Sequence, residues 1–243
     1  MVETKTFSKF GFWFPLVGVL AVTLLEAIVF VLGYVFLKWS INLESAAILS
    51  IVWYISLGLW GLLGWKLSKT KIKEVFTLQN ITIKKLLNTA GIAVLAQGLF
   101  IGITFLLSDV LNQNIKGNAD NIINSEMSNV AVITTIIITV VFAPIFEEIL
   151  FRGLFFDGFY NTSKKLKASN KVALALTVAL TSIIFGLAHV TSLDLNAVFI
   201  VFATGSFGAY LAYLRIKTKS ITLGIIAHAI FNSLTIILML FSL

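Results

Sequence analysis

The stretch Glu147-Glu148-Ile149-Leu150-Phe151-Arg152 decides how this chain folds, because it places three charged residues inside the apolar run 130–159. A charged side chain in a membrane span costs roughly 2.5–3.5 kcal/mol on insertion scales, so it is expected to face a protein interior or a wet cavity. In a helix, Glu148 and Arg152 are four residues apart and share a face, where they can pair. Glu147 is rotated by about 100° from its neighbour. The stretch therefore predicts one structural ion pair and one carboxylate that is available for chemistry.

The composition around this stretch is that of a membrane protein. Of the 243 residues, 58% are hydrophobic and 12% are charged, whereas charged residues make up about 25% of soluble domains. The apolar runs are about 20 residues long, which is the length that crosses a hydrocarbon core. A transmembrane β-barrel would instead alternate polar and apolar residues. We therefore expect an all-α, polytopic transmembrane helical bundle of about seven spans, with eight as the alternative count.

Seven apolar runs define the expected spans: 11–37, 46–67, 86–110, 129–159, 172–189, 195–214 and 221–241. The first run is too long for the apolar part of a signal peptide, so we expect it to be a permanent span. Pro144 is expected to kink the fourth span just before the carboxylates. These spans divide the chain into an N-terminal region of three spans, residues 1–125, and a region of four spans, residues 126–243, which holds the candidate catalytic residues.

The basic residues predict the orientation of the spans, because cytosolic segments carry an excess of lysine and arginine. Only Lys38 and Lys116 flank the spans on one side, and Arg152 lies inside a span. The other side carries Lys5, Lys9, Lys66, Lys69, Lys71, Lys73, Lys84, Lys85, Lys164, Lys165, Lys167, Lys171, Arg215, Lys217 and Lys219. We therefore expect a cytosolic N-terminus and an outside C-terminus. Topology also explains the net charge of +7, so the expected surroundings are membrane lipid and no nucleic-acid partner is expected.

The residues suited to chemistry gather in the late spans. The chain has no cysteine, which excludes disulfides, thiolate metal sites and a thiol nucleophile. Its two histidines, His189 and His228, lie in the fifth and seventh spans, where Phe185/His189 and His228/Asn232 each share a helix face. In the hairpin of spans four and five, Glu147 and His189 are offset by about five residues, or roughly 7–8 Å. The Glu147 carboxylate and the two histidines can therefore converge in a pocket nearer the cytosol.

Two hydrolytic schemes fit this set of residues. A carboxylate among apolar groups can act as general base toward water, while a histidine and an asparagine amide one turn apart can donate hydrogen bonds to an oxyanion. Two histidines and one glutamate can equally hold a catalytic zinc ion with an open position. The soluble signatures H-E-x-x-H and G-x-S-x-G are both absent, so the residues leave the two schemes open.

Three motifs taken together, Glu147-Glu148-x-x-x-Arg152, Phe185-x-x-x-His189 and His228-x-x-x-Asn232, lie in this order on successive late spans. In this they resemble the CAAX protease and bacteriocin-processing family, also called the CPBP or Abi family of type II CAAX prenyl endopeptidase-like intramembrane proteases. The resemblance covers roughly residues 140–234. It implies an intramembrane endopeptidase that cleaves a membrane-delivered peptide or protein, in CAAX-type, leader, pheromone or bacteriocin processing. It also implies a multi-pass protein, which we expect in the plasma membrane of a prokaryote.

The resemblance also implies a role for each motif residue. Glu147 would activate water with His189, while His228 and Asn232 would stabilise the oxyanion. Three further residues would support the site: Glu148, Arg152 and Phe185. Members of the family are described both as metalloproteases and as glutamate-dependent enzymes. We favour the scheme without a cofactor; in a zinc-dependent enzyme the ligands would be Glu147, His189 and His228.

Two other classes of function remain as alternatives. One is a non-proteolytic immunity or signalling partner that keeps the fold; intact Glu147 and histidines weigh against it. The other is a transporter that uses Glu26, in the middle of the first span, together with Glu147. Transporters of this kind are commonly built from internal repeats, and the two halves of this sequence show none.

Overall fold

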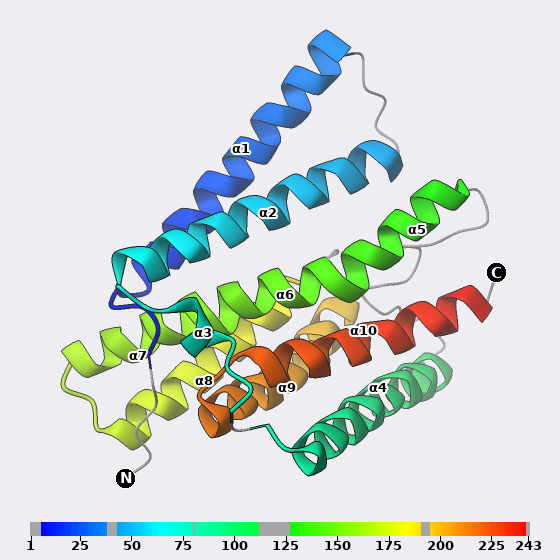
Figure 1. Ribbon diagram of the computed structural model, residues 1–243. Coiled ribbons are helices and arrows are strands. Elements are labelled where there is room, and N and C mark those ends of the chain that lie inside the picture. The colour runs from blue at the N-terminus through cyan, green and yellow to red at the C-terminus, as the bar shows by residue number, and fades with distance from the viewer. Residues whose placement is uncertain (1–5, 38–42, 80, 112–126, 191–194, 242–243) are drawn as a thin grey trace.

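The computed structural model describes residues 6–37, 43–79, 81–111, 127–190 and 195–241, in which every regular element is a helix (Figure 1). In chain order these are α1 (Trp13–Leu37), α2 (Leu43–Leu67), α3 (Ile72–Val75), α4 (Ile83–Leu111), α5 (Asn129–Ile137), η1 (Ile138–Phe142), α6 (Ala143–Glu148), η2 (Ile149–Phe155), α7 (Phe156–Lys165), α8 (Asn170–Leu187), α9 (Leu195–Thr218) and α10 (Thr222–Phe241). The expected all-α helical bundle is confirmed. The boundary that we expected between residues 125 and 126 lies outside the described residues.

The fourth expected span is one continuous helix of 37 residues, Asn129–Lys165, formed by α5, η1, α6, η2 and α7. It ends six residues later than the run 129–159 predicts. Two segments of it, η1 and η2, are π-helical. A proline ring clashes with the carbonyl four residues before it in a regular α-helix, and here a wider π-helical segment immediately precedes Pro144. The disturbance expected at the proline is therefore taken up by η1, and the two glutamates lie between the two π-helical segments.

Six helices of the described residues are long and apolar enough to cross a membrane: Trp13–Phe36, Ile83–Val110, Asn129–Lys165, Asn170–Leu187, Asn196–Thr218 and Thr222–Phe241. The expected second span, 46–67, coincides with α2, a helix of 25 residues that is not in this set. Length and hydropathy thus support six spans, and α2 is the candidate for the seventh.

Successive long helices run in alternating directions, so the basic connections gather at one end of the bundle (Figure 1). At this end the turn between α9 and α10 contacts α3, where the Ile221 amide and the Ser220 hydroxyl both donate to the Val75 carbonyl. The N-terminal segment lies there too, with the Lys9 amide donating to the Ser68 hydroxyl. The basic flanks, which follow every second span in the sequence, therefore lie together at one end of the bundle.

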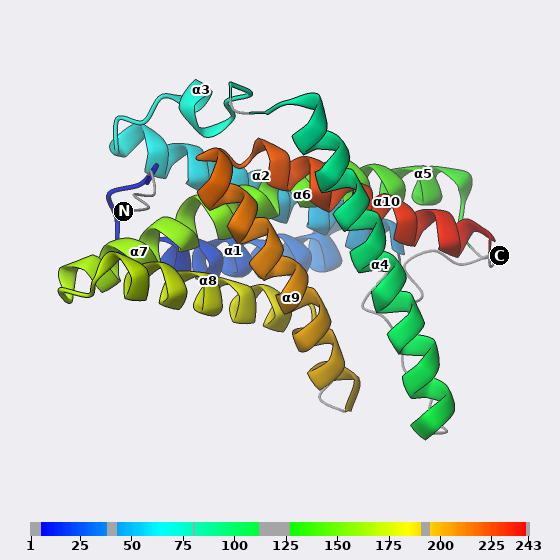
Figure 2. The same cartoon turned by 90° about the horizontal axis from the view of Figure 1, so that it is seen from below.

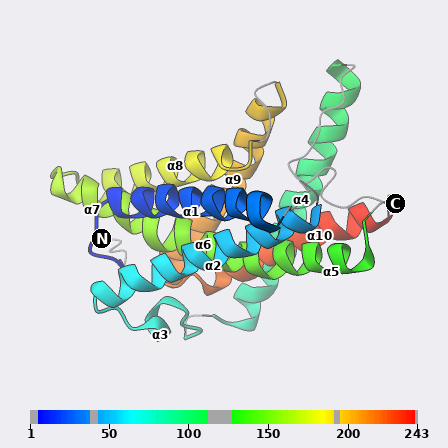
Figure 3. The same cartoon turned by 90° about the horizontal axis from the view of Figure 1, so that it is seen from above.

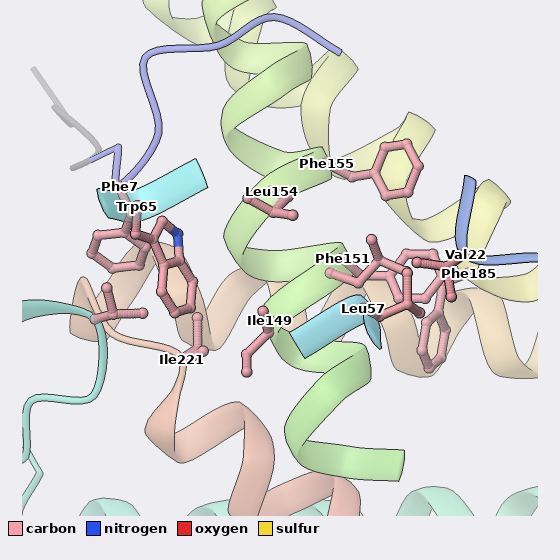
Figure 4. Packing of buried hydrophobic residues seen from close by; sticks show 12 residues of the cluster. Phe7, Val22, Leu57, Trp65, Ile149, Phe151, Leu154, Phe155, Phe185 and Ile221 are labelled. Atoms are coloured by element: carbon pink, nitrogen blue, oxygen red, sulfur yellow. The ribbon is translucent and has the colours of Figure 1, made fainter. Parts of the chain in front are cut away.

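The main apolar core surrounds η2, whose residues Ile149, Phe151 and Leu154 lie in its middle (Figure 4). Leu57 and Trp65 reach it from α2, which lies beside α1 and α6 (Figure 3). Three glycines let α2 come this close: Gly58, Gly61 and Gly64. A Cβ at Gly58 would lie 2.2 Å from the Phe146 ring, and one at Gly61 would lie 2.4 Å from Ile149. The first half of the chain is thereby fixed against the helix that carries the glutamates.

The outer helices expose the apolar side chains that a lipid environment requires. Helix α4 packs mainly against α10, which it crosses, so that the far end of α4 points away from α10 (Figure 2). Its residues Leu95, Leu99 and Phe105 are more than half exposed, as is Phe36 of α1. Large exposed apolar surfaces are rare on soluble monomers, so this surface supports the prediction of an integral membrane protein.

Arg215 corrects one prediction from the sequence. We expected it in a basic flank beyond a span ending at residue 214, but α9 continues to Thr218 and the Arg215 side chain is fully buried. Its Nη2 atom lies 3.1 Å from Asp157 Oδ1, and its Nε donates to the Arg152 carbonyl at 3.1 Å. The other oxygen of Asp157 accepts from the backbone amides of Phe7 and Ser8, at 2.5 and 2.6 Å. This buried pair therefore fastens the N-terminal segment to α7 and α9.

Candidate active site

The ion pair predicted from the four-residue spacing is formed at the centre of the bundle. Arg152 Nη1 donates to Glu148 Oε1 at 2.8 Å, and Arg152 Nη2 donates to the Gly208 carbonyl at 2.9 Å. The guanidinium lies 4.3 Å from the centroid of the Phe185 ring. At Gly224 of α10 a Cβ would lie 2.8 Å from Glu148 Oε2, so only glycine lets α10 approach here. Charge, cation–π contact and a close helix crossing together fix α6, η2, α9 and α10 relative to one another.

Glu147 points away from this pair and toward both histidines. Its Oε2 atom lies 3.8 Å from His189 Nε2 and 3.8 Å from His228 Nε2. This oxygen is buried and has no hydrogen-bond partner among the described residues. A separation of 3.8 Å is too long for a direct hydrogen bond, and a water molecule beside the three atoms can bridge them. The three candidate residues thus converge as the hairpin geometry predicts, around a buried carboxylate oxygen that has no hydrogen-bond partner among the described residues.

His189 lies just beyond a helix end. The run 172–189 predicts it inside a span, but α8 ends at Leu187 and His189 lies in the following turn. Its Nδ1 atom is 2.7 Å from the carbonyl oxygen of Phe185, one of the carbonyls that a helix end leaves unpaired. A carbonyl can only accept, so Nδ1 carries the proton and donates. In the neutral ring Nε2 is then an acceptor, and it faces the Glu147 carboxylate.

His228 and Asn232 come from one face of α10, as their spacing predicts. His228 has a carboxylate at each ring nitrogen, with Nδ1 3.4 Å from Glu148 Oε1 and Nε2 toward Glu147. Asn232 Nδ2 donates to the Thr139 carbonyl at 2.8 Å. Thr139 belongs to η1, and a π-helical segment changes which carbonyls are paired within the helix. One of the two amide hydrogens of Asn232 is used in this contact, and the other is free to donate.

These residues surround a cavity of about 160 Å³. Its lining comes from α2, η1, α6, α8, α9 and α10, and consists of Tyr54, Ile138, Thr139, Ala143, Glu147, Phe185, His189, Thr204, Phe207, His228, Phe231, Asn232 and Thr235. All four candidate catalytic residues are in this lining. Glu148 and Arg152 lie behind it, which agrees with a supporting role. Glu26 of α1 does not line the cavity, so the structure gives the transporter alternative no second carboxylate there.

Tyr54 is the residue of the site that sequence analysis missed. It lies in α2 and donates its hydroxyl hydrogen to Glu147 Oε1 at 2.9 Å. Its ring stacks on Phe146, with centroids 6.2 Å apart and an angle of 19° between the planes. A tyrosine in the middle of an apolar run was the only available signal. The sequence does not give the register of α2 against α6, and only that register brings Tyr54 to the carboxylate.

The donor atoms that zinc would use are present at the cavity, but they are spread apart. The two histidine Nε2 atoms each lie 3.8 Å from Glu147 Oε2. Neighbouring ligands of a tetrahedral zinc ion with bonds of about 2.0–2.1 Å lie about 3.4 Å apart. Within the described part of the chain no group of three or more such side chains is arranged to hold a metal ion. The donor types fit zinc, and their spacing fits a bridging water better.

In the comparison with known proteins, the late part of the chain matches a family model. The family model described as type II CAAX prenyl endopeptidase Rce1-like matches residues 129–234. The match begins at α5 and ends within α10, so it contains all seven site residues named from the sequence. Tyr54, α1, α2 and α4 lie outside it. No curated protein and no solved structure matches the chain.

Proposed function

We propose that the protein hydrolyses a peptide bond of a membrane-delivered peptide or protein, on the premise that residues 129–234 match the family model described as type II CAAX prenyl endopeptidase Rce1-like. The observation that carries the proposal is the unpartnered Oε2 atom of Glu147, which faces two histidine Nε2 atoms at 3.8 Å in a cavity between membrane helices. CAAX-type substrates, leader peptides, pheromones and bacteriocin precursors are all membrane-delivered peptides of this kind.

The first step is the activation of water. A water molecule in the gap donates one hydrogen to Glu147 Oε2 and the other to His189 Nε2, because both atoms are acceptors when His189 carries its proton on Nδ1. Its lone pair then points away from both residues and toward a substrate carbonyl in the cavity. As the oxygen–carbon bond forms, Glu147 takes the proton and acts as general base.

The second step is the stabilisation and breakdown of the tetrahedral intermediate. The Nε2 atom of His228 lies at the cavity, and with a hydrogen on that nitrogen the ring can donate to the oxyanion. Asn232 donates with the amide hydrogen that Thr139 leaves free. These two donors stabilise the oxyanion. The carbon–nitrogen bond then breaks, and the proton held by Glu147 passes to the leaving amine.

A zinc-dependent version of the enzyme would use the same atoms for another purpose. His189 Nε2, His228 Nε2 and Glu147 Oε2 would hold the ion, and zinc would supply a Lewis acid and an activated water. The hydrogen bond from His189 Nδ1 to a carbonyl is of the kind that orients metal-binding histidines. We favour the glutamate scheme because Asn232 is placed as an oxyanion donor, one helical turn from His228.

The deciding experiment compares the wild type with Glu147→Gln, both purified in detergent, on a library of membrane-anchored peptides. The substitution keeps the size and the acceptor oxygen but removes the base, so we expect cleavage to fall by at least about a thousand-fold. Zinc per chain is counted in the same preparations, and cleavage is repeated after chelation. Cleavage that survives chelation supports the glutamate scheme, whereas stoichiometric zinc with chelator-sensitive cleavage supports the metal scheme.

The control for this experiment is Glu26→Gln, the same chemical change in a span that does not line the cavity. This variant is expected to cleave like the wild type. If the wild type cleaves none of the peptides and Glu147→Gln leaves the cellular phenotype unchanged, the protease proposal is wrong, and a non-proteolytic partner protein takes its place.

A further inference from the structure

The contact between Tyr54 and Glu147 joins two parts of the chain that the family match separates. Tyr54 lies outside residues 129–234, in α2, while Glu147 lies inside them. The hydroxyl-to-carboxylate distance is 2.9 Å. Four residues after Tyr54, Gly58 lets α2 approach α6 until Phe146 fills the space where a Cβ would be. The two helices lie side by side along this contact (Figure 3), so the placement of Tyr54 follows from the helix crossing.

The two oxygens of Glu147 are thereby made different. Oε1 accepts the Tyr54 hydrogen, whereas Oε2 has no partner and faces the two histidines. A carboxylate on a freely turning side chain would expose either oxygen. The hydroxyl fixes the plane of the carboxylate, and the stacking of the Tyr54 ring on Phe146 fixes the hydroxyl. Only one oxygen is then presented to the water site.

Resting on the proposed function, we propose that Tyr54 is a positioning residue for the peptidase reaction, which dedicates Glu147 Oε2 to the proton transfer. A hydrogen bond to an ionised group is among the stronger hydrogen bonds in proteins, so the Tyr54 hydroxyl holds the Glu147 carboxylate in one orientation. The titratable groups that face Glu147 are Tyr54 from α2, His189 from the turn after α8 and His228 from α10, and the Arg152 guanidinium of η2 also interacts with it electrostatically.

Tyr54→Phe tests this role, because it removes the hydroxyl and keeps the ring that stacks on Phe146. We expect kcat to fall about ten- to a hundred-fold with KM within about two-fold of the wild type. The matched control is Tyr213→Phe, the same change at a residue that is half exposed on α9. It is expected to leave kcat and KM unchanged.

A second variant keeps the test valid if Tyr54→Phe folds poorly. Tyr54 replaced by 3,5-difluorotyrosine keeps the ring and the donor hydroxyl, so kcat is expected to stay close to that of the wild type. An unchanged kcat in well-folded Tyr54→Phe would overturn the inference while leaving the protease in place. A rise in KM that accounts for the whole loss would also overturn it, because Tyr54 would then bind substrate instead.

One measurement does not depend on activity and separates the two proposals. The melting temperatures of the wild type, Tyr54→Phe, Glu147→Ala and the double variant form a cycle, because each single change removes the hydrogen bond. Non-additive shifts are expected from a direct contact between the two side chains. Additive shifts overturn the positioning role even if no peptide is cleaved, whereas a coupled pair in a chain that cleaves nothing shows that the proposed function, and not the contact, has failed.

Discussion

At the scale of single residues, the hydrogen bond of His189 to a helix end determines what the site can do. The Phe185 carbonyl accepts from Nδ1, so the other nitrogen turns its lone pair toward Glu147. In the neutral ring two acceptors then face each other across 3.8 Å, and a water molecule that donates to both can lie between them. A metal ion bound by both atoms would serve the alternative scheme. Phe185 therefore contributes its carbonyl as well as its ring.

Asn232 gives the residue-scale test of the oxyanion site. Asn232→Ala removes the free amide hydrogen, and we expect kcat to fall about 10²–10³-fold with little change in KM, because the donor acts on charge that develops only in the transition state. Steady-state kinetics with a cleaved peptide measure both constants. The neighbouring Ser233→Ala removes a hydroxyl bound to the Ala229 carbonyl of its own helix, and is expected to leave kcat unchanged. Equal losses in the two variants would contradict the oxyanion role.

At the scale of elements, glycines decide how closely the helices pack. At Gly186 of α8, a Cβ would lie 2.6 Å from the Val201 carbonyl oxygen of α9, with Val201 Cα at 3.0 Å. These are backbone atoms and cannot turn aside. On α4, by contrast, Gly98 has nothing within 4 Å of the place of its Cβ. The same substitution therefore meets a helix at one site and open space at the other.

The prediction is that Gly186→Ala destabilises the protein by roughly 1–3 kcal/mol through overpacking, whereas Gly98→Ala is neutral or stabilises by up to about 1 kcal/mol through helix propensity. Unfolding in mixed detergent, followed by circular dichroism, measures both. Gly186→Ala is also expected to lower kcat, since His189 lies in the turn three residues later. Equal stability of the two variants would show that α8 and α9 are not packed as closely as the structure has them.

Sequence patterns predict contacts between residues of one helix, and they fail for contacts that depend on how two helices pack. The pairing of Glu148 with Arg152 and the shared face of His228 and Asn232 follow from spacing within one helix. The contact of Tyr54 with Glu147 depends on the register between α2 and α6, which no periodicity contains. The end of α8 before His189 was missed as well, because its apolar run continues past the last helical residue.

At the scale of the whole molecule, buried charges connect the ends of the bundle to its centre. The Arg215 guanidinium bonds Asp157 and the Arg152 carbonyl, and Arg152 in turn bonds Glu148 beside the cavity. Asp157 also holds the backbone of the N-terminal segment. Counting Arg215 as a flanking charge hid this network, since composition does not distinguish a buried arginine from an exposed one. The alternation of the other basic flanks is unaffected.

The orientation of the molecule in the membrane gives the last prediction. The helix Asn129–Lys165 spans 37 residues, or about 55 Å at 1.5 Å per residue, so both of its ends extend beyond a hydrocarbon core of about 30 Å. Lys165 and Asn129 are exposed at these ends. Since the chain has no cysteine, Lys165→Cys and Asn129→Cys each introduce a single thiol. The excess of basic residues in the flanks predicts that Lys165 lies in the cytosol.

We therefore expect a membrane-impermeant maleimide to label Asn129→Cys in intact cells and Lys165→Cys only after lysis. The cysteine-free wild type sets the background, and labelling after lysis shows that each thiol is reactive. The reverse pattern would place the basic end outside, and labelling of both thiols in intact cells would mean that the helix does not cross. With the expected pattern, the turns joining α7 to α8 and α9 to α10 are cytosolic. The turns next to the helices that carry Glu147 and His228 then lie on the side of the membrane that a newly made peptide reaches first.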